Sequence, residues 1–372
     1  MSFRLSFRRK IMRIAIAIDS LAGGGAEKVM ITLAKQFISL GHEPHFLVME
    51  DNRYYETPDN LPVHQCFADK DKDYDHFGRL GASVDKLRAK IAEIESRVGK
   101  FDLFLSNLDK TNLMMTKTGV TPLYVIVHSS VEEELSRQFK LGPFAYYKKL
   151  RAKKALNGQH LITVSNGIAK EIQAKGRLQP ASMRTIYNPF EFNEIVAQSQ
   201  QENPQIPQGD YLIHVGRFAK QKRHDVLFEA LKQTQNQLPV VLLCHNHKKA
   251  IKAAKKFGIE KRLIIPGFQS NPFPWIKGAK ALVLSSDFEG LPTVLIESLA
   301  CGTPVVSTDC PHGPNEILTG NLAPYLVPRR NPAALAKMID AVVAQPPSLD
   351  NVEILAKVDA TAIAEQYLAL AK

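Results

Sequence analysis

Two glutamates, Glu289 and Glu297, give the strongest chemical signal in the sequence. They lie in the stretch Ser-Ser-Asp-Phe-Glu-Gly-Leu-Pro-Thr-Val-Leu-Ile-Glu, between a strand-like run and a helix-like run. The free N–H groups and positive dipole end of a helix N-terminus form a natural phosphate site. The carboxylates can accept hydrogen bonds from sugar or ribose hydroxyls, and Thr293 can cap the helix or contact the phosphate. The alternative is an ordinary helix start, where the dipole favours glutamate.

Two cations follow another predicted strand. Arg217 comes directly after Gly216, and Lys222 follows shortly afterwards. Fixed cations stabilise the charge that grows on a diphosphate as its bond to a sugar breaks. A basic loop alone is usually just solvated. The order strand, Gly-Arg, Lys, helix and then the glutamate loop is much more specific.

The elements that must position these residues alternate between strand and helix. A buried strand is predicted at 13–18, and the glycines 23–25 break it before a helix at 26–40. Further strands are predicted at 44–49, 101–106, 123–127 and 161–164, and 42–75 reads otherwise as a loop-rich insertion. A βαβ opening implies a parallel sheet.

A second α/β series follows a linker rich in Gln, Asn and Pro at 198–209. Its predicted strands are at 211–215, 240–243, 263–265, 281–284 and 304–306, and its helices are at 226–233, 248–257, 294–300 and 333–343. The last stretch, 351–371, has a helical pattern. Two doubly wound sheets place their ligand crevices at the carboxyl ends of their strands, so the motifs should face each other across a cleft.

Length and composition agree with two globular domains. The chain has 372 residues, 45% hydrophobic and 23% charged, with a net charge of +11 that favours anionic partners. The four scattered cysteines suggest reduced thiols in a cytosolic protein. No apolar run is long enough for a membrane span, and the basic start is not a secretory signal. Met12 is an alternative start, so residues 1–11 are either native or a disordered extension.

These motifs resemble those of the retaining glycosyltransferases of family 4, which have the GT-B fold. Glu289 and Glu297 resemble the E-x7-E motif of that family, and Gly216-Arg217 with Lys222 resembles its diphosphate clamp. The glycine loop at 23–27 and Asn188-Pro189 resemble its first loop and the end of its first domain. The resemblance covers the chain from residue 13 onward and is more specific in the second half.

The resemblance implies a role for each matching residue. Arg217 and Lys222 would bind the donor diphosphate, Glu297 the ribose hydroxyls and Glu289 the donor sugar. Backbone N–H groups would hold sugar or phosphate oxygens, and the glycine loop would let the backbone approach the phosphates and the acceptor. His128, after the strand at 123–127, matches the active-site histidine, although it could simply orient a loop. The implied catalytic residues are Glu289, His128, Arg217 and Lys222, and the implied donor-binding residues are Gly24, Gly25, Arg217, Lys222, Glu289, Gly290, Leu291, Thr293 and Glu297.

The resemblance also implies the architecture and the reaction. Two Rossmann-like domains, 1–190 on the acceptor side and 206–352 on the nucleotide-sugar side, would face a cleft, with a helix at about 353–372 packing back on the first. The enzyme would move a hexose or N-acetylhexosamine, with retention, from a nucleotide-diphosphate sugar, most often UDP in this family, to a saccharide or lipid-linked acceptor. Such enzymes build bacterial lipopolysaccharide or surface polysaccharide. No protein nucleophile, cofactor or metal is expected.

Some residues depart from the family pattern. Cys244-His245-Asn246-His247 replaces a glycine-rich turn and invites a metal interpretation, but no second ligand pair has zinc-site spacing. Arg223 stands where the family commonly has glycine and offers another anion contact. The alternating aspartates Asp69, Asp71, Asp73 and Asp75 mimic a metal motif, yet intervening lysines favour a solvated loop.

A basic, aromatic segment runs from Tyr146 to Lys154 with the sequence Tyr-Tyr-Lys-Lys-Leu-Arg-Ala-Lys-Lys. It suits an anionic membrane surface or RNA, and otherwise a helix with one solvated basic face. We favour the membrane, which places the protein in the cytoplasm, peripheral to the inner membrane. The segment 309–317 resembles that of surface-polysaccharide enzymes, so Gly313 and Glu316 either line the donor side or stand in a proline-shaped loop.

Three other functions compete with the transferase. A nicotinamide enzyme is disfavoured because the third glycine of GxGxxG is missing. A GT-B nucleotide-sugar epimerase is closer, but the two glutamates argue against it. A basic nucleic-acid-binding protein fits the charge, yet no recognised module accompanies it and no nucleic-acid partner is expected.

Overall fold

The structure is a computed structural model that describes residues 10–22, 24–68 and 74–371. Of residues 1–11, which are either native or an extension, the structure therefore describes only Lys10 and Ile11. Asp69, Asp71 and Asp73 of the aspartate series lie outside the described residues, as does Gly23.

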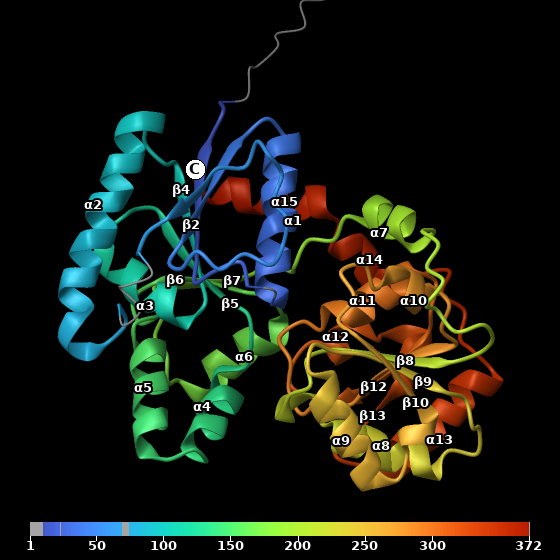
Figure 1. Cartoon of the computed structure of the whole chain (residues 1–372). Helices are drawn as coiled ribbons and strands as arrows, with labels where there is room; N and C mark the ends of the chain where they lie inside the picture. Colours follow the sequence, from blue (N-terminus) through green and yellow to red (C-terminus); the bar gives the residue numbers. More distant parts are fainter. Residues whose placement is uncertain (1–9, 23, 69–73, 372) are drawn as a thin grey trace, which may run out of the picture.

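A seven-stranded sheet, all of whose strand pairs are parallel, forms the first half of the molecule (Figure 1). Its strand order is β3-β2-β1-β4-β5-β6-β7. The interior strand β1 is buried from Ile14 to Ile18, which explains its continuous apolar run. The strands are β1 Arg13–Ile18, β2 Glu43–Val48, β3 Val63–Gln65, β4 Leu103–Asn107, β5 Leu123–Val127, β6 His160–Thr163 and β7 Ser182–Thr185. The helices are α1 Gly25–Ser39, α2 Leu80–Val98, α3 Asp109–Thr118, α4 Val131–Phe139, α5 Pro143–Lys154 and α6 Asn166–Lys175.

A six-stranded parallel sheet forms the second half. Its order is β10-β9-β8-β11-β12-β13. The strands are β8 Leu212–Val215, β9 Val240–Leu243, β10 Leu263–Gly267, β11 Ala281–Leu284, β12 Val305–Asp309 and β13 Leu326–Pro328. The helices are α8 His224–Gln233, α9 His247–Phe257, α10 Phe273–Lys277, α11 Thr293–Ala300, α12 Pro314–Ile317 and α13 Pro332–Ala344. The predicted two-sheet α/β fold is confirmed.

The strand order reverses once in each sheet, between β1 and β4 and between β8 and β11. Such a reversal opens a crevice at the carboxyl ends of the strands, because the connecting helices leave toward opposite faces. The loops after β8 and β11 carry Arg217 and Glu289, and the loop after β1 carries Gly24. The fold therefore places all three at such crevices.

Two segments connect the halves. Helix α7 (Phe192–Ser199) follows the first sheet, and helix α14 (Glu353–Lys357) leads back to α15 (Ala360–Leu368). Figure 1 shows α15 beside α1, where Thr361 donates a hydrogen bond to Gln36 at 3.3 Å. Because this helix packs on the first half, we propose 1–190 together with about 353–372 as one domain and 206–352 as the other.

Three strands were not predicted: β3, β7 and β13. Each lies at an edge of its sheet, and each is only partly buried. The strand β3 falls within 42–75, so this stretch is less irregular than we expected. No helix among the described residues is long and apolar enough to span a membrane.

Candidate active site

A cleft of about 530 Å³ lies between the two halves of the molecule. Segments that follow strands β1, β4, β5, β8, β9 and β11 line it, so both sheets point their carboxyl ends at it. Every residue that the resemblance implies as catalytic or donor-binding lines this cleft. They are Gly24, Gly25, His128, Arg217, Lys222, Glu289, Gly290, Leu291, Thr293 and Glu297.

Glu289 and Lys222 form a direct ion pair in the second half of the cleft. The Nζ of Lys222 lies 2.7 Å from Oε1 of Glu289, and the Ser286 hydroxyl donates to the same oxygen at 2.6 Å. Both side chains are largely shielded from solvent. The loops that carry them are also bound to each other, since the Ser285 hydroxyl donates to the Lys222 carbonyl at 2.7 Å. These contacts hold both side chains in place without a bound ligand.

Arg217 differs from Lys222 because no carboxylate of the described residues forms a direct ion pair with it. Its side chain is exposed, and it forms no hydrogen bond or ion pair with the residues that the structure describes. Across the cleft, burial raises the pKa of Glu27, whereas the positive charge of Arg217 opposes that shift. Arg217 is therefore the cation most available to an incoming anion.

Arg223 does not supply the further anion contact that we considered. Its guanidinium pairs with Asp287 at 3.0 Å and with Asp225 at 2.7 Å. Burial would raise the pKa of Asp287, but hydrogen bonds from Arg330 and Arg223 outweigh it and lower this pKa. Arg223 itself adopts a left-handed φ of 49°, which explains why glycine suits this position.

Two helix N-termini line the cleft from opposite sides. Helix α1 begins at Gly25 and helix α11 at Thr293, and neither N-cap residue provides a side-chain hydrogen bond. The first N–H groups of such helices need other partners, and the helix dipole favours anions there. Thr293 lies at the first position of α11 and does not cap it. A side chain added at Gly25 would meet open space, so no contact with the described residues requires glycine there.

His128 follows β5 and provides a neutral ring at the cleft. Its Nε2 lies 2.8 Å from Oδ1 of Asn107, whose Nδ2 donates to the Ala17 carbonyl. This amide orientation makes Nε2 the protonated nitrogen and leaves Nδ1 as an acceptor. Burial and the nearby Lys153 lower the pKa of His128 to about 4. The imidazole is therefore neutral at pH 7.

The two halves touch where Gly290 meets His128. A methyl group added at Gly290 would lie only 1.9 Å from the His128 carbonyl oxygen. Glycine is needed here because the two backbones approach too closely for any side chain. The loop is held on its other side as well, since the Glu289 N–H donates to the Pro311 carbonyl at 2.6 Å.

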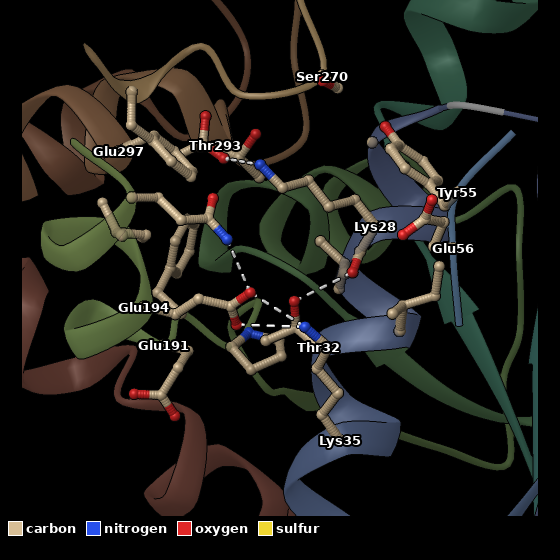
Figure 2. Close-up of a pocket in the computed structure, with 18 residues that line it drawn as sticks. Lys28, Thr32, Lys35, Tyr55, Glu56, Glu191, Glu194, Ser270, Thr293 and Glu297 are labelled. Atoms are coloured by element: carbon tan, nitrogen blue, oxygen red, sulfur yellow. Dashed lines mark hydrogen bonds and ion pairs between the residues drawn. The ribbon is translucent and has the colours of Figure 1, made fainter. Parts of the chain in front are cut away.

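Glu297 is buried and pairs with Lys28, a residue that the sequence analysis did not assign. Figure 2 shows Lys28 reaching from α1 to Glu297 on α11, with Nζ 2.7 Å from Oε1. The pair stands where the cleft adjoins a smaller pocket of about 190 Å³ between α1 and α7. No sequence signal identified Lys28, because the contact joins residues that are far apart in the chain.

Gly313 and Glu316 do not line the cleft. Glu316 accepts hydrogen bonds from the N–H groups of Asn166 and Gly167, at 2.9 and 2.7 Å. It thus caps the start of α6 in the first half, and Gly313 packs against the loop around Gly290. Glu316 therefore joins the two halves of the molecule, whereas the nearest neighbours of Gly313 all lie in the second half.

The residues after β9 that depart from the family pattern contact aromatic side chains. His245 lines the cleft and stacks on Phe268 with ring centroids 4.1 Å apart. Tyr54, from the first half, meets the Phe268 ring edge-on. Within the described ranges, no three His, Cys, Asp or Glu side chains are grouped closely enough to hold a metal ion.

The basic segment of α5 is less solvated than its sequence indicates. Lys153 is only 4% exposed and pairs with Asp109 at 2.8 Å and Glu134 at 2.9 Å, and Lys149 joins both carboxylates. Burial would raise the pKa of Glu134, but these cations lower it well below its usual range. Two lysines of the segment therefore support the wall beside His128, and only the others can face a partner.

The two halves of the chain match two glycosyltransferase family models. Residues 23–194 match the model described as Glycosyltransferase Family 4, and residues 197–358 match that described as Glycosyl transferases group 1.

Individual proteins are similar over different lengths. A Campylobacter jejuni N-acetylgalactosamine-N,N'-diacetylbacillosaminyl-diphospho-undecaprenol 4-alpha-N-acetylgalactosaminyltransferase is 25% identical over 82% of this chain and 83% of its own length. Lipopolysaccharide 1,6-galactosyltransferase of Salmonella typhimurium is 31% identical, but over 50% of this chain and 52% of its own length. The structure of HepE from Anabaena in complex with UDP and glucose is 20% identical and superposes with a TM-score of 0.68 over 97% of both chains. With both halves matched, the chain belongs to the family 4 glycosyltransferases and has their GT-B fold.

Proposed function

We propose that this enzyme transfers a hexose or N-acetylhexosamine, with retention of configuration, from a UDP-sugar to a saccharide or lipid-linked acceptor in bacterial lipopolysaccharide or surface-polysaccharide synthesis. The observation that carries the proposal is the meeting of Arg217, Lys222, Glu289, Glu297 and two uncapped helix N-termini in one cleft. A nucleotide sugar needs this set: cations for the diphosphate and fixed acceptors for hydroxyls. The UDP-bound HepE structure and the sugar transferases among the relatives support the choice of donor class.

Each group has a distinct role in the proposed reaction. Arg217 binds the diphosphate, since no carboxylate among the described residues pairs directly with its guanidinium. Lys222 lies between that diphosphate and Glu289, which holds the hydroxyls of the donor sugar. The bond from the anomeric carbon to the phosphate oxygen breaks, the acceptor oxygen bonds to that carbon on the same face, and its proton passes to the leaving phosphate. The neutral His128 accepts a hydrogen bond from a sugar hydroxyl through Nδ1 without adding charge.

A panel of UDP-, GDP- and ADP-sugars tests this proposal. We expect UDP-sugars alone to raise the melting temperature and to be hydrolysed slowly to UDP, with EDTA making no difference because Arg217 and Lys222 supply the positive charge. The Arg217→Ala variant is the negative control. Conversion of a UDP-sugar to its epimer, or salt-sensitive RNA binding with no nucleotide binding, would contradict the proposal.

The acceptor side includes a surface suited to an anionic membrane. The turn between α4 and α5, together with the helix ends that flank it, exposes four large apolar side chains beside Lys140 and Lys148, and Phe144 is 84% exposed. The four are Phe139, Leu141, Phe144 and Tyr147. Apolar side chains flanked by lysines bind the interface of anionic bilayers. This surface overlaps the start of the segment 146–154. We propose that it docks the enzyme on the cytoplasmic face of the inner membrane, within reach of a lipid-linked acceptor.

Vesicle flotation tests the membrane contact. We expect binding to phosphatidylglycerol vesicles but not to phosphatidylcholine vesicles, and loss of binding in Phe144→Ser/Tyr147→Ser. Ile251→Ser removes an exposed apolar side chain from the other half and serves as the matched control. Equal flotation of the double variant and the control would show that this surface is not the docking site.

A further inference from the structure

The ion pair between Lys28 and Glu297 links the two walls of the cleft at the proposed ribose site. Lys28 lies on α1 of the first half and Glu297 on α11 of the second, with 2.7 Å between Nζ and Oε1. The ammonium also lies 4.7 Å from the ring centre of Phe273, again in the second half. Both described partners of this ammonium therefore belong to the opposite wall of the cleft.

The two members of this pair differ in exposure. The Glu297 side chain is only 7% exposed, whereas that of Lys28 is 42% exposed. A buried carboxylate needs a cation or hydrogen-bond donors, because removing its charge from water is costly. Lys28 supplies such a partner and fixes one oxygen of the carboxylate. Recognition of a ribose diol requires an acceptor in a fixed position, because only a ligand with a hydroxyl at that position can donate a hydrogen bond to it.

We propose that Lys28 is a positioning residue of the donor site: it orients Glu297 toward the ribose hydroxyls and makes ribose recognition depend on contact between the two halves. This inference rests on the proposed function, because it takes Glu297 as the ribose acceptor. Lys28 acts through Glu297 and not through the diphosphate, which Arg217 and Lys222 bind.

Binding of UDP and 2′-deoxy-UDP, measured by calorimetry, tests this role. We expect the wild type to prefer UDP about tenfold, as for one hydrogen bond to a charged acceptor. In Lys28→Met the preference should fall below about threefold, mainly because UDP binds more weakly. Lys28→Arg keeps a cation and should recover a preference above about threefold.

Lys35→Met is the matched control. Lys35 lies on the same helix, lines the same small pocket and pairs with Glu194 at 3.1 Å, but it does not contact Glu297. We expect this variant to keep the full preference for UDP. In the background of Glu297→Gln, adding Lys28→Met should change UDP binding less than about twofold, because two residues that act through one contact are not additive.

The outcomes separate this inference from the proposed function. A wild type that binds none of UDP, GDP and ADP overturns both. If the wild type binds UDP and Lys28→Met keeps the preference, or binds UDP more tightly, only the role of Lys28 is overturned, since the pair would then be incidental or would compete with ribose. Full additivity with Glu297→Gln would likewise overturn it.

Discussion

The two walls of the cleft handle ligands with different chemistry. The wall of the second half presents charge in Arg217, Lys222 and Glu289, and hydrogen bonds between its loops hold Lys222 and Glu289. The wall of the first half, which we call the neutral wall, presents a neutral imidazole at His128 and the backbone of the glycine loop, and its cation Lys28 is already paired with Glu297. A charged donor needs fixed opposite charges, whereas an acceptor hydroxyl needs a site that adds none. The charged wall therefore left the clearer pattern in the sequence.

The largest effect is expected on the charged wall. Arg217→Ala should lower kcat/KM for the UDP-sugar about 10³-fold, because one cation that stabilises the charge of the leaving diphosphate is lost. The free energy of unfolding should change by less than about 0.5 kcal/mol, since Arg217 is exposed and has no described partner. Initial rates and melting temperatures measure both. Lys220→Ala, an exposed lysine of the same loop, is the control, and full activity of Arg217→Ala would refute the assignment.

Glu289→Ala should nearly abolish transfer as well, yet it should differ from Arg217→Ala in stability. Removing this carboxylate leaves the shielded Lys222 without its 2.7 Å partner. We expect a loss of about 1–3 kcal/mol in the free energy of unfolding, measured in urea. If Glu289→Ala has the same unfolding free energy as the wild type, this wall is less preorganised than its contacts indicate.

The sequence predicted the charged wall well and the neutral wall poorly, for physical reasons. Buried central strands are apolar runs, so the ends of β8 and β11 and the motifs that follow them could be located. The edge strands β3, β7 and β13 are half-exposed and lack that pattern. Lys28 received no role and Lys153 was placed in a membrane-facing segment, because the partners of both lysines are distant in the chain. Charge alone does not tell a buried lysine from a free one.

The next effect concerns stability, because the buried Lys153 supports the neutral wall behind His128. Lys153→Met leaves Asp109 and Glu134 without a buried cation, which should cost about 3 kcal/mol of unfolding free energy. Lys148→Met, which removes an exposed lysine of the same helix, should cost less than about 0.5 kcal/mol. Urea denaturation of both variants compares them. Similar losses would mean that the two lysines are equally solvated.

Gly290→Ala tests the contact between the walls. The added methyl group would overlap the His128 carbonyl oxygen, so the halves would have to separate slightly. A small displacement of this kind should lower kcat/KM about 10²-fold while leaving the fold intact. Gly81→Ala, where a methyl group meets open space, should keep full activity. Normal activity of Gly290→Ala would show that the cleft works in a more open arrangement.

The smallest effect concerns protons, and it tests whether each wall buries a neutral histidine. Burial lowers the pKa of His128 and of His214, which lies in β8, to about 4 in each case. The unfolded chain binds a proton near pH 6.5, so the stability of a neutral histidine is complete above that pH and is lost as the pH falls toward 4.

At pH 5 each histidine should cost the fold about 2 kcal/mol relative to pH 8. Glutamine at either position removes the titration, so the difference in unfolding free energy between pH 8 and pH 5 should shrink by about that amount in His128→Gln and again in His214→Gln. Comparing differences within each variant cancels the cost of the substitution itself. If only His214→Gln changes the difference, His128 is protonated in the folded protein at pH 5, and the neutral wall carries charge at that pH after all.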